Sequence, residues 1–363
     1  MLVVGRFGRG LAAAVAVLAL CAPIAQTAPA KQRVNLHMLA RGLVKQGAPG
    51  AVVFVRTPTA VQSAASGFES LSPRVAMRAS DRYRIASVTK SFVATVVLQL
   101  EAEGRLKIGD PIERWLPGVV PNGAAITLRE LLNHTSGLFN YTEDPVFTTS
   151  LLLDPTRRRS PQELLSVAFT HPPLFPPGTT SAYSNTNFIV LGLVIEAITG
   201  RPLDQVLQER IFGPLRLAAT SFPTAISVGP GFAHGYTSVE GNPLVDVTSI
   251  LSPTIAAAGA IVSNAADVSK FYSVLLLRRL LPAAQLAEME LVTAPASSYG
   301  LGLAVAHTRC GKAFGHEGLF PGWHNFAFAT ANGRRVGVAM VNADYSRLTF
   351  RLEQAAETAL CSG

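Results

Sequence analysis

The chain has few residues in the spacings that bind metal ions. It contains three cysteines and seven histidines, with neither a Cys-x-x-Cys nor a His-Glu-x-x-His pattern. Zinc sites usually use such spacings, so we expect no metal site. His134 lies in the apolar segment LLNHTSGL and is expected to be structural. No repeat or low-complexity tract points to a solenoid or a linker.

Charged residues are scarce as well, especially acidic ones. Only 15% of positions are charged and 48% are hydrophobic, as in a globular protein. The 31 Lys and Arg outnumber the 23 Asp and Glu, for a formal charge of +8. The arginines are scattered, and no aromatic residues alternate with them, so nucleic acid is excluded as a partner. An anionic envelope polymer and a merely soluble basic surface both stay open.

No hydrophobic run is long enough to form a stable membrane span. Two arginines precede the uncharged run Leu11–Ala25, and a small-residue cleavage motif ends at Ala30. This pattern predicts a secretory signal peptide at residues 1–30 and a single mature domain at 31–363. We therefore expect a secreted or periplasmic protein, with a lipid anchor at Cys21 as the alternative.

Removal of the leader would leave only Cys310 and Cys361. Export to an oxidising compartment favours a disulfide between them. Two free buried thiols are the alternative.

Apolar patterning divides the mature chain into strand-rich ends and a helix-rich middle. The predicted strands are Gly50–Thr57, Ala60–Phe68 and the segments YGLGLAVAH, KAFGHEG, WHNFAFAT and RRVGVAMVN. Helices near the ends are predicted at Asn35–Gln46, from Val88 onward, from Asp267 to Leu281 and at Phe350–Leu360.

These elements predict an α/β (α+β) fold. Residues of about 31–103 and 251–363 would form an antiparallel sheet that is built from both chain ends and flanked by helices. Residues of about 104–250 would form an inserted all-helical subdomain. We expect a cleft between the two parts.

Lysine is rare, with six copies against 25 arginines, and one lysine lies in an unusual place. From Val88 the apolar residues recur at helical spacing, yet Lys90 lies in the first turn, near the positive end of the helix dipole. Ser87 precedes it by three positions and shares its helix face. A desolvated lysine can act as the base for a serine hydroxyl. The alternative is a helix-capping serine beside a snorkelling lysine.

Two later segments carry polar residues at places where a substrate could bind. Tyr183 and Asn185 lie in a Gly/Pro-rich loop before an apolar helix, where they could relay a proton and hold a substrate amide. An ordinary capped loop is the alternative. His316, Glu317 and Gly318 close a predicted strand, where a glycine would let a substrate backbone come close. A structural histidine is the alternative there.

In this order, Ser-x-x-Lys, Tyr-x-Asn and His-x-Gly resemble the motifs of the serine β-lactamase and penicillin-binding peptidase superfamily. The resemblance spans nearly the whole mature chain and looks closest to the secreted D-alanyl-D-alanine carboxypeptidase of the class C type. It implies that Ser87 is the acylated nucleophile, that Lys90 is its base and that Tyr183 shares the proton relay.

The resemblance also implies how a small peptide, ester or β-lactam substrate would bind. Asn185 would bind the substrate amide, while His316 would polarise the relay and, with Glu317, line the site. The backbone N–H groups of Ser87 and Leu319 would form the oxyanion hole. No cofactor is implied, and we expect a monomer.

The chain departs from the carboxypeptidase where the substrate's terminal carboxylate would bind. Ala304, Glu317 and Leu319 replace an arginine and two threonines, and His307 or Arg309 could compensate. The carboxylate of Glu317 would face the substrate or pair with a neighbouring arginine. The sequence thus predicts a serine hydrolase for D-amino-acid peptide, amide or ester bonds. A β-lactamase, an esterase, a D-aminopeptidase and a slow penicillin-binding envelope protein are the alternatives.

Overall fold

The computed structural model of the chain describes residues 34–362 apart from 155, 224–228, 239–243, 250–255 and 296. The predicted signal peptide, with Cys21 and its cleavage motif, lies outside the described residues. So does the predicted junction near residue 250 between the helical and the sheet segments.

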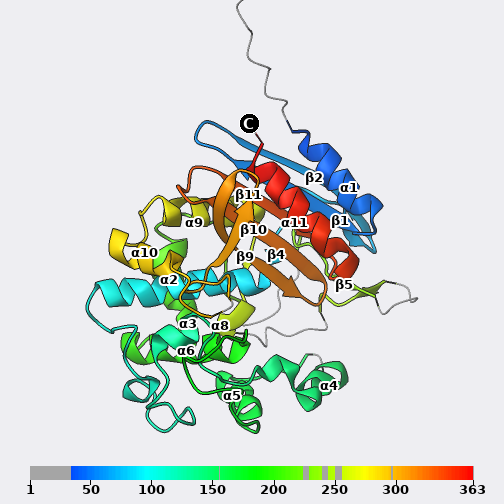
Figure 1. Ribbon diagram of the computed structural model, residues 1–363. Helices are drawn as coiled ribbons and strands as arrows, with labels where there is room; N and C mark the ends of the chain where they lie inside the picture. Colours follow the sequence, from blue (N-terminus) through cyan, green and yellow to red (C-terminus); the bar gives the residue numbers. More distant parts are fainter. Residues whose placement is uncertain are drawn as a thin grey trace, which may run out of the picture. The chain divides into compact units, whose positions relative to one another are not determined.

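A seven-stranded antiparallel sheet is built from both ends of the chain (Figure 1). Its strands are β1 (Gly50–Arg56), β2 (Val61–Leu71), β3 (Arg74–Ala76), β8 (Ala304–Thr308), β9 (Gly311–Phe320), β10 (Trp323–Thr330) and β11 (Val336–Val341). Their order in space is β3-β2-β1-β11-β10-β9-β8, so the early and late strands meet where β1 pairs with β11. The predicted fold class is confirmed.

Helices flank the sheet and form most of the middle of the chain. They are α1 (Leu36–Lys45), α2 (Thr89–Ala102), α3 (Leu128–Leu132), α4 (Pro145–Leu153), α5 (Pro161–Ala168), α6 (Asn185–Thr199), α7 (Leu203–Leu207), α8 (Ala256–Gly259), α9 (Ala265–Leu276), α10 (Ala283–Glu290) and α11 (Ser346–Leu360). Two short strand pairs lie outside the large sheet: β4 (Tyr83–Arg84) with β7 (Val262–Ser263), and β5 (Tyr236–Thr237) with β6 (Val245–Asp246). The second pair falls within the segment 104–250, so the expectation that this segment is all helical is wrong.

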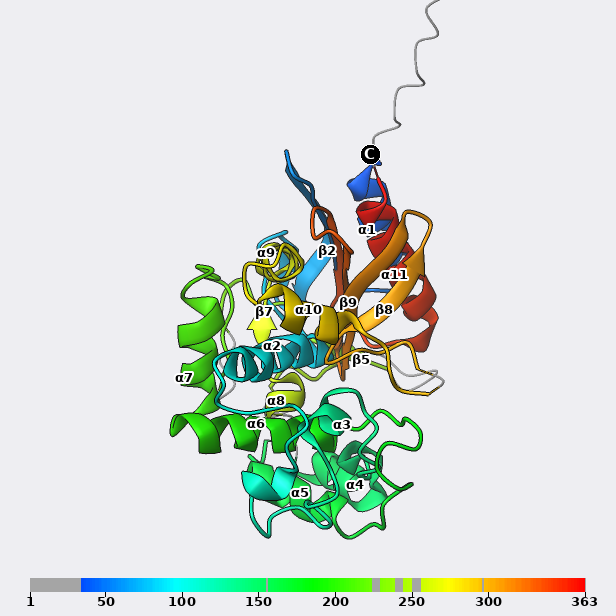
Figure 2. The same ribbon diagram turned by 60° about the vertical axis from the view of Figure 1, so that its left-hand side comes forward.

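Both faces of the sheet are covered, and the sequence of β1 shows why. Ala51, Val53 and Val55 pack into the cluster under α1 and α11, whereas Val52 and Phe54 point into the larger core on the other face. Successive side chains of a strand point to opposite faces, so a strand covered on both sides is apolar throughout. Figure 2 shows α1 and α11 on one side of the sheet and α9 on the other.

Helix α2 runs between the sheet side of the molecule and the inserted helices, and is buried on almost all sides. It contacts α6, α7, α8 and α10, and the Phe92 ring stacks on Phe271 with centroids 3.6 Å apart. A helix that is apolar all round belongs in a core. The turn before α2 is therefore held firmly.

Several predicted element boundaries differ from the structure. The helix expected at Phe350–Leu360 begins at Ser346, and the strand expected to end at Phe68 continues to Leu71. The strand expected to close at Gly318 continues to Phe320, so His316, Glu317 and Gly318 lie inside β9. The helix expected to run through Leu281 ends at Leu276.

Within the described residues, no single helix is long and apolar enough to cross a membrane. Asn185–Thr199 and Leu203–Phe212 meet that criterion only jointly, by length and composition, and they are bent by 80°. Most of α6 is buried inside the protein.

Candidate active site

Ser87 lies in a tight 3-10 turn, Ala86–Val88, immediately before α2. Ala86 has a φ of 47°, in the left-handed region that non-glycine residues rarely adopt. Such strain costs about 1–3 kcal/mol and tends to occur at functional sites. The turn is pinned because the Ile85 N–H donates to the Ile261 carbonyl at 3.0 Å. The backbone therefore presents Ser87 in one defined position.

Lys90 is completely buried in the first turn of α2. Its Nζ atom lies 3.0 Å from Ser87 Oγ, 2.8 Å from Asn185 Oδ1 and 2.7 Å from the Ala258 carbonyl oxygen. Among the described residues, no carboxylate forms a salt bridge with it. Desolvation therefore holds the pKa of Lys90 well below the usual 10.5.

As a neutral amine, which its lowered pKa favours, Lys90 has two N–H donors and one lone pair for its three partners. The Asn185 amide oxygen and the Ala258 carbonyl can only accept, so each takes one N–H of the amine. The nitrogen lone pair is then left for the Ser87 hydroxyl, which can donate. In this arrangement an amine can take the proton of a serine nucleophile.

Tyr183 lies beside the Ser87 and Lys90 pair. Its ring centroid is 4.9 Å from Lys90 Nζ and 4.3 Å from the imidazole of His134. Desolvation raises the pKa of Tyr183 above the usual 10.0, and a hydrogen bond with Ser87 opposes the shift. The residue is 41% exposed, so solvent reaches the ring while the hydroxyl stays protonated.

His134 supports the Tyr183 ring from the interior. It is buried, and its Nδ1 atom accepts from the Ser184 backbone N–H and from Asn187 Nδ2, both at 3.2 Å. Burial, together with the charge of Lys90, lowers the pKa of His134 well below 6.5, so the ring is neutral. Its ring packs against those of Tyr183 and Tyr299, and His134 itself does not line the cavity at Ser87.

Asn185, the first residue of α6, is engaged at both ends of its amide. Oδ1 accepts from Lys90, while Nδ2 donates to Asn140 Oδ1 at 3.3 Å and to Thr142 Oγ1 at 3.1 Å. The structure thus places Asn185 against Lys90. The hydrogen bond expected between Asn185 and a substrate amide stays a prediction.

His316 comes to the site from β9 and is buried. Its Nδ1 atom contacts the Glu317 carbonyl oxygen, which can only accept, so the ring proton is assigned to Nδ1. Nε2 then accepts from the Tyr299 hydroxyl at 2.7 Å. Burial, with the nearby charge of Lys90, lowers the pKa of His316 to about 3, so the ring stays neutral.

Glu317 follows His316 on β9 and therefore points to the opposite face of the strand. Its Oε1 atom lies 2.6 Å from Nε2 of the buried His324 on β10, and 44% of its side chain is exposed. The partner of Glu317 is thus a histidine, where the sequence left a choice between a substrate and an arginine. Its influence on substrates stays a prediction.

Gly318 lies where β9 passes over the turn that carries Ser87. A Cβ atom at this position would overlap the Ile85 carbonyl oxygen and meet the Val88 side chain. Glycine is therefore needed at this position because the segment that carries Ser87 lies so close to β9. An approach by a substrate backbone to the same residue stays a prediction.

Half of one edge of β9 is left without a strand partner among the described residues. Strand β8 pairs with β9 only between Thr308, opposite Gly311, and Ala304, opposite Gly315. The segment His316–Phe320 has β10 on its other side. Leu319 on this segment and Ser87 line the same cavity, so the open edge borders Ser87.

The cavity at Ser87 has a volume of about 260 Å³. Its described walls are Ser87, Thr142, Phe147, Thr148, Leu151, Asn185, Ala258, Leu319, Phe320 and Pro321. None of these carries a charge, and six are apolar. The cavity suits an uncharged, apolar side chain.

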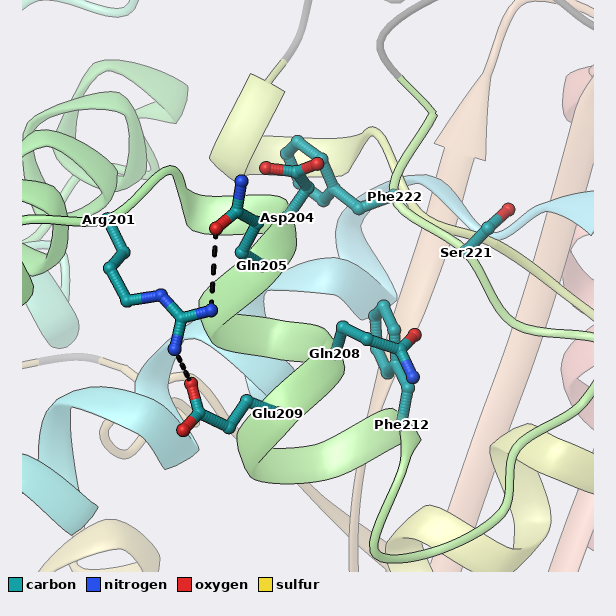
Figure 3. Close-up of a pocket in the computed structure, with 8 residues that line it drawn as sticks. All are labelled: Arg201, Asp204, Gln205, Gln208, Glu209, Phe212, Ser221 and Phe222. Carbon is teal, nitrogen blue, oxygen red and sulfur yellow. Dashed lines mark hydrogen bonds and ion pairs between the residues drawn. The ribbon is translucent and has the colours of Figure 1, made fainter.

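A larger cavity of about 520 Å³ lies beside α7 (Figure 3). Its lining residues are Arg201, Asp204, Gln205, Gln208, Glu209, Phe212, Ser221 and Phe222. Arg201 pairs with Glu209 and donates to Gln205. None of the predicted site residues lines this cavity.

His307 and Arg309 lie far from the nucleophile. His307 is paired with Lys312, and the Arg309 backbone N–H donates to Glu357 of α11. At about 3.3 Å per residue, Lys312 and Leu319 are roughly 20 Å apart along β9. The expectation that His307 or Arg309 could replace the missing arginine is therefore wrong. Ala304 lies opposite Gly315, at the end of β8 nearer the site.

Cys310 and Cys361 form a disulfide in the structure, with their Cα atoms 5.4 Å apart. Cys310 lies in the turn between β8 and β9, and Cys361 directly follows α11. The bond therefore ties the end of α11 to the end of the sheet that is remote from Ser87.

The sequence analysis missed several residues that hold the site together. They are Asn140 and Thr142 behind Asn185, Tyr299 at His316, His324 at Glu317 and the carbonyl of Ala258 at Lys90. Tyr299 begins the YGLGL segment, which was used only to place a strand. Within the described ranges, no cluster of three or more potential metal ligands occurs.

A mixed sheet-and-helix fold with Ser-x-x-Lys at the start of a buried central helix is the architecture of the β-lactamase/transpeptidase-like serine hydrolases. Residues 32–360 match the family described as Beta-lactamase, and the chain belongs to this family. The predicted family and enzyme class are confirmed.

Several solved structures and curated relatives are similar to this chain. The D-stereospecific amidohydrolase from Streptomyces sp. is 38% identical with a TM-score of 0.81, over 88% of this chain and 97% of that chain. The D-amino acid amidase from Ochrobactrum anthropi SV3 is 27% identical with a TM-score of 0.80, over 90% and 96%. The D-aminopeptidase of Brucella anthropi is 30% identical over 324 residues, which cover 85% of this chain and only 59% of that protein.

Proposed function

We propose that the protein hydrolyses amide or ester bonds of D-amino-acid derivatives through an acyl-enzyme on Ser87. The observation that carries this proposal is the state of Lys90. A lysine that is fully buried, has no acidic partner among the described residues and lies 3.0 Å from a serine hydroxyl is suited to act as a base. The D-configuration is supported by the activities of the similar D-stereospecific amidohydrolase and D-aminopeptidase.

In the proposed reaction, Ser87 Oγ attacks the substrate carbonyl carbon while its proton passes to Lys90 Nζ. The backbone N–H groups of Ser87 and Leu319 stabilise the oxyanion. Tyr183 carries the proton from the lysine to the leaving amine or alcohol as the C–N or C–O bond breaks. Water, activated by the same groups, then hydrolyses the ester to Ser87 and regenerates the serine.

The substrate would lie along the open edge of β9, with its acyl side chain in the 260 Å³ cavity. The uncharged walls of that cavity favour an apolar side chain on the acyl group. No cationic side chain lines the described part of the cavity, so a free terminal carboxylate would lack a counter-ion there. We therefore favour a neutral amide or ester over the D-Ala-D-Ala carboxypeptidase reaction.

Export is part of this proposal. It is supported by the N-terminal pattern of two arginines, an uncharged run and a cleavage motif. The paired Cys310 and Cys361 suit an oxidising compartment.

The test combines covalent labelling with turnover. Intact-protein mass spectrometry after incubation with a penicillin should show one adduct on the wild type and none on Ser87→Ala. Wild type should release product from D-phenylalaninamide and from D-phenylalanine methyl ester, and much less from the L-enantiomers of both. One equivalent of product followed by a stall would indicate a slow penicillin-binding protein instead. The proposal fails if the wild type is neither labelled nor active, or if Ser87→Ala retains its activity.

A further inference from the structure

A chain of hydrogen bonds leads from an exposed carboxylate to the buried base. Glu143 Oε1 accepts from Asn140 Nδ2 at 2.9 Å. Because a carboxylate can only accept, this bond turns the amide oxygen of Asn140 the other way. That oxygen then accepts from the Asn185 backbone N–H at 3.1 Å, from Asn185 Nδ2 at 3.3 Å and from Thr142 Oγ1 at 2.9 Å.

The orientation of Asn140 therefore sets the orientation of Asn185. With Nδ2 of Asn185 directed at Asn140 and Thr142, its Oδ1 must face Lys90. The neutral amine donates one N–H to that oxygen and the other to the Ala258 carbonyl, so its lone pair is left for Ser87. Each step follows from which atoms can donate and which can only accept.

We propose that Asn140 is a positioning residue that fixes the amide of Asn185 and thereby keeps the lone pair of Lys90 directed at Ser87. This inference rests on the proposed function, in which Lys90 is the base. Asn140 is 6% exposed and does not line the cavity, so it acts through Asn185 and touches no substrate.

Without the hydrogen bonds to Asn140, the Asn185 amide could rotate and place Nδ2 against Lys90. Two donors would then face each other, and the amine would lose one of its two acceptors. A charged ammonium loses more than a neutral amine when an acceptor is removed, because hydrogen bonds to charged groups are stronger. The pH midpoint of acylation should therefore move downward, while the plateau rate falls because the lone pair no longer faces the nucleophile.

The experiment measures acylation by a chromogenic ester against pH in the full-length protein. We expect Asn140→Leu to lower the plateau rate at least about tenfold, with a lower pH midpoint and an almost unchanged KM. Asn133→Leu is the matched control: Asn133 is 4% exposed, its Oδ1 also accepts from Thr135, and no bond links it to Asn185. That variant should bear a similar folding cost without moving the midpoint.

A rescue variant keeps the test decisive if Asn140→Leu does not fold. In Asn140→Asp the new carboxylate would face Glu143 and repel it, so the single change should impair acylation. Adding Glu143→Gln supplies a donor to the aspartate, whose other oxygen still accepts from Asn185. The double variant should acylate within about threefold of wild type, a difference of well under 1.4 kcal/mol.

Folded Asn140→Leu with the wild-type rate and pH midpoint would overturn the inference, as would a folded double variant that is no faster than Asn140→Asp. A wild-type protein that is never acylated refutes the proposed function instead. In that case, side-chain NMR of ¹⁵N-labelled asparagine tests, independently of catalysis, whether Asn140 fixes the Asn185 amide. The Asn185 NH₂ should exchange faster in Asn140→Leu than in wild type, because only the bond to Thr142 is left, and equal protection in both would refute the role of Asn140.

Discussion

Replacement of Gly318 by alanine should displace Ser87, the proposed nucleophile. The added methyl group would overlap the Ile85 carbonyl oxygen, one residue before the strained Ala86. Neither side can yield easily. Asn325 Nδ2 donates to the Arg84 carbonyl at 2.9 Å and lies 3.4 Å from the Gly318 carbonyl, which ties β9 and β10 to the strand before the turn.

The expected size of the effect follows from this rigidity. Overpacking by a methyl group typically costs about 1–3 kcal/mol. A displacement of a reacting group by about 1 Å can cost about 100-fold in rate. We therefore expect Gly318→Ala to unfold at a lower temperature than wild type and to acylate about 100-fold more slowly.

The assay is thermal unfolding together with the rate of acylation by a penicillin, measured on the same preparations. Gly42→Ala is the matched control, because a Cβ at Gly42 in α1 meets no atom within 4 Å. Alanine in a helix interior is favoured by about 0.5–1 kcal/mol over glycine, so this control should be at least as stable as wild type and fully active. Wild-type stability and acylation in Gly318→Ala would refute the steric argument.

Three further predictions concern charge and covalent linkage. With neutral Lys90 as the proposed base, kcat/KM should rise with pH through an apparent pKa well below 10.5 and fall at lower pH as the amine is protonated. Lys90→Ala should lose this pH dependence and nearly all activity, and a variant with most of the wild-type rate contradicts the assignment. The Glu317 carboxylate should lower kcat/KM for substrates that end in a free carboxylate at least about tenfold relative to their amides, or about 1.4 kcal/mol. Glu317→Thr should reduce this difference in kcat/KM, and an unchanged difference would mean that Glu317 does not affect the substrate. Removing the disulfide with Cys310→Ala should lower the free energy of unfolding by about 4 kcal/mol in the chain-entropy model. The unreduced wild-type protein should take up no thiol-alkylating reagent, and two reactive thiols would show that the bond is not formed.

The sheet and the central helix could be predicted from the sequence because their patterns are local. The apolar run of β1 indicates burial on both faces, and the apolar spacing after Val88 indicates a buried helix that makes Lys90 conspicuous. The end of β9 was misplaced for an equally local reason. Phe320 pairs with Trp323 across a two-residue turn that contains Gly322 at a φ of 91°, so pairing continues past Gly318.

The supporting contacts of the site could not be predicted in the same way. Asn140 and Asn185 are 45 positions apart, and nothing in either segment indicates which loop will face the other. The pairing of Glu317 with His324 depends on the register of β9 and β10, since both side chains must fall on the same face. A carboxylate near basic residues suggested an arginine partner, but only the folded sheet selects among nearby bases.

The junction of β1 with β11 has a consequence for how the chain acquires its structure. Gly50 donates to the Asn342 side chain across 292 positions, so the central pairing of the sheet is among the least local contacts in the protein. Closing so long a loop is slow relative to local helix formation. Until β11 arrives, one edge of the apolar strand β1 has no partner and can pair with another chain. Folding yield should therefore depend steeply on protein concentration, and a chaperone that shields extended apolar segments should raise it.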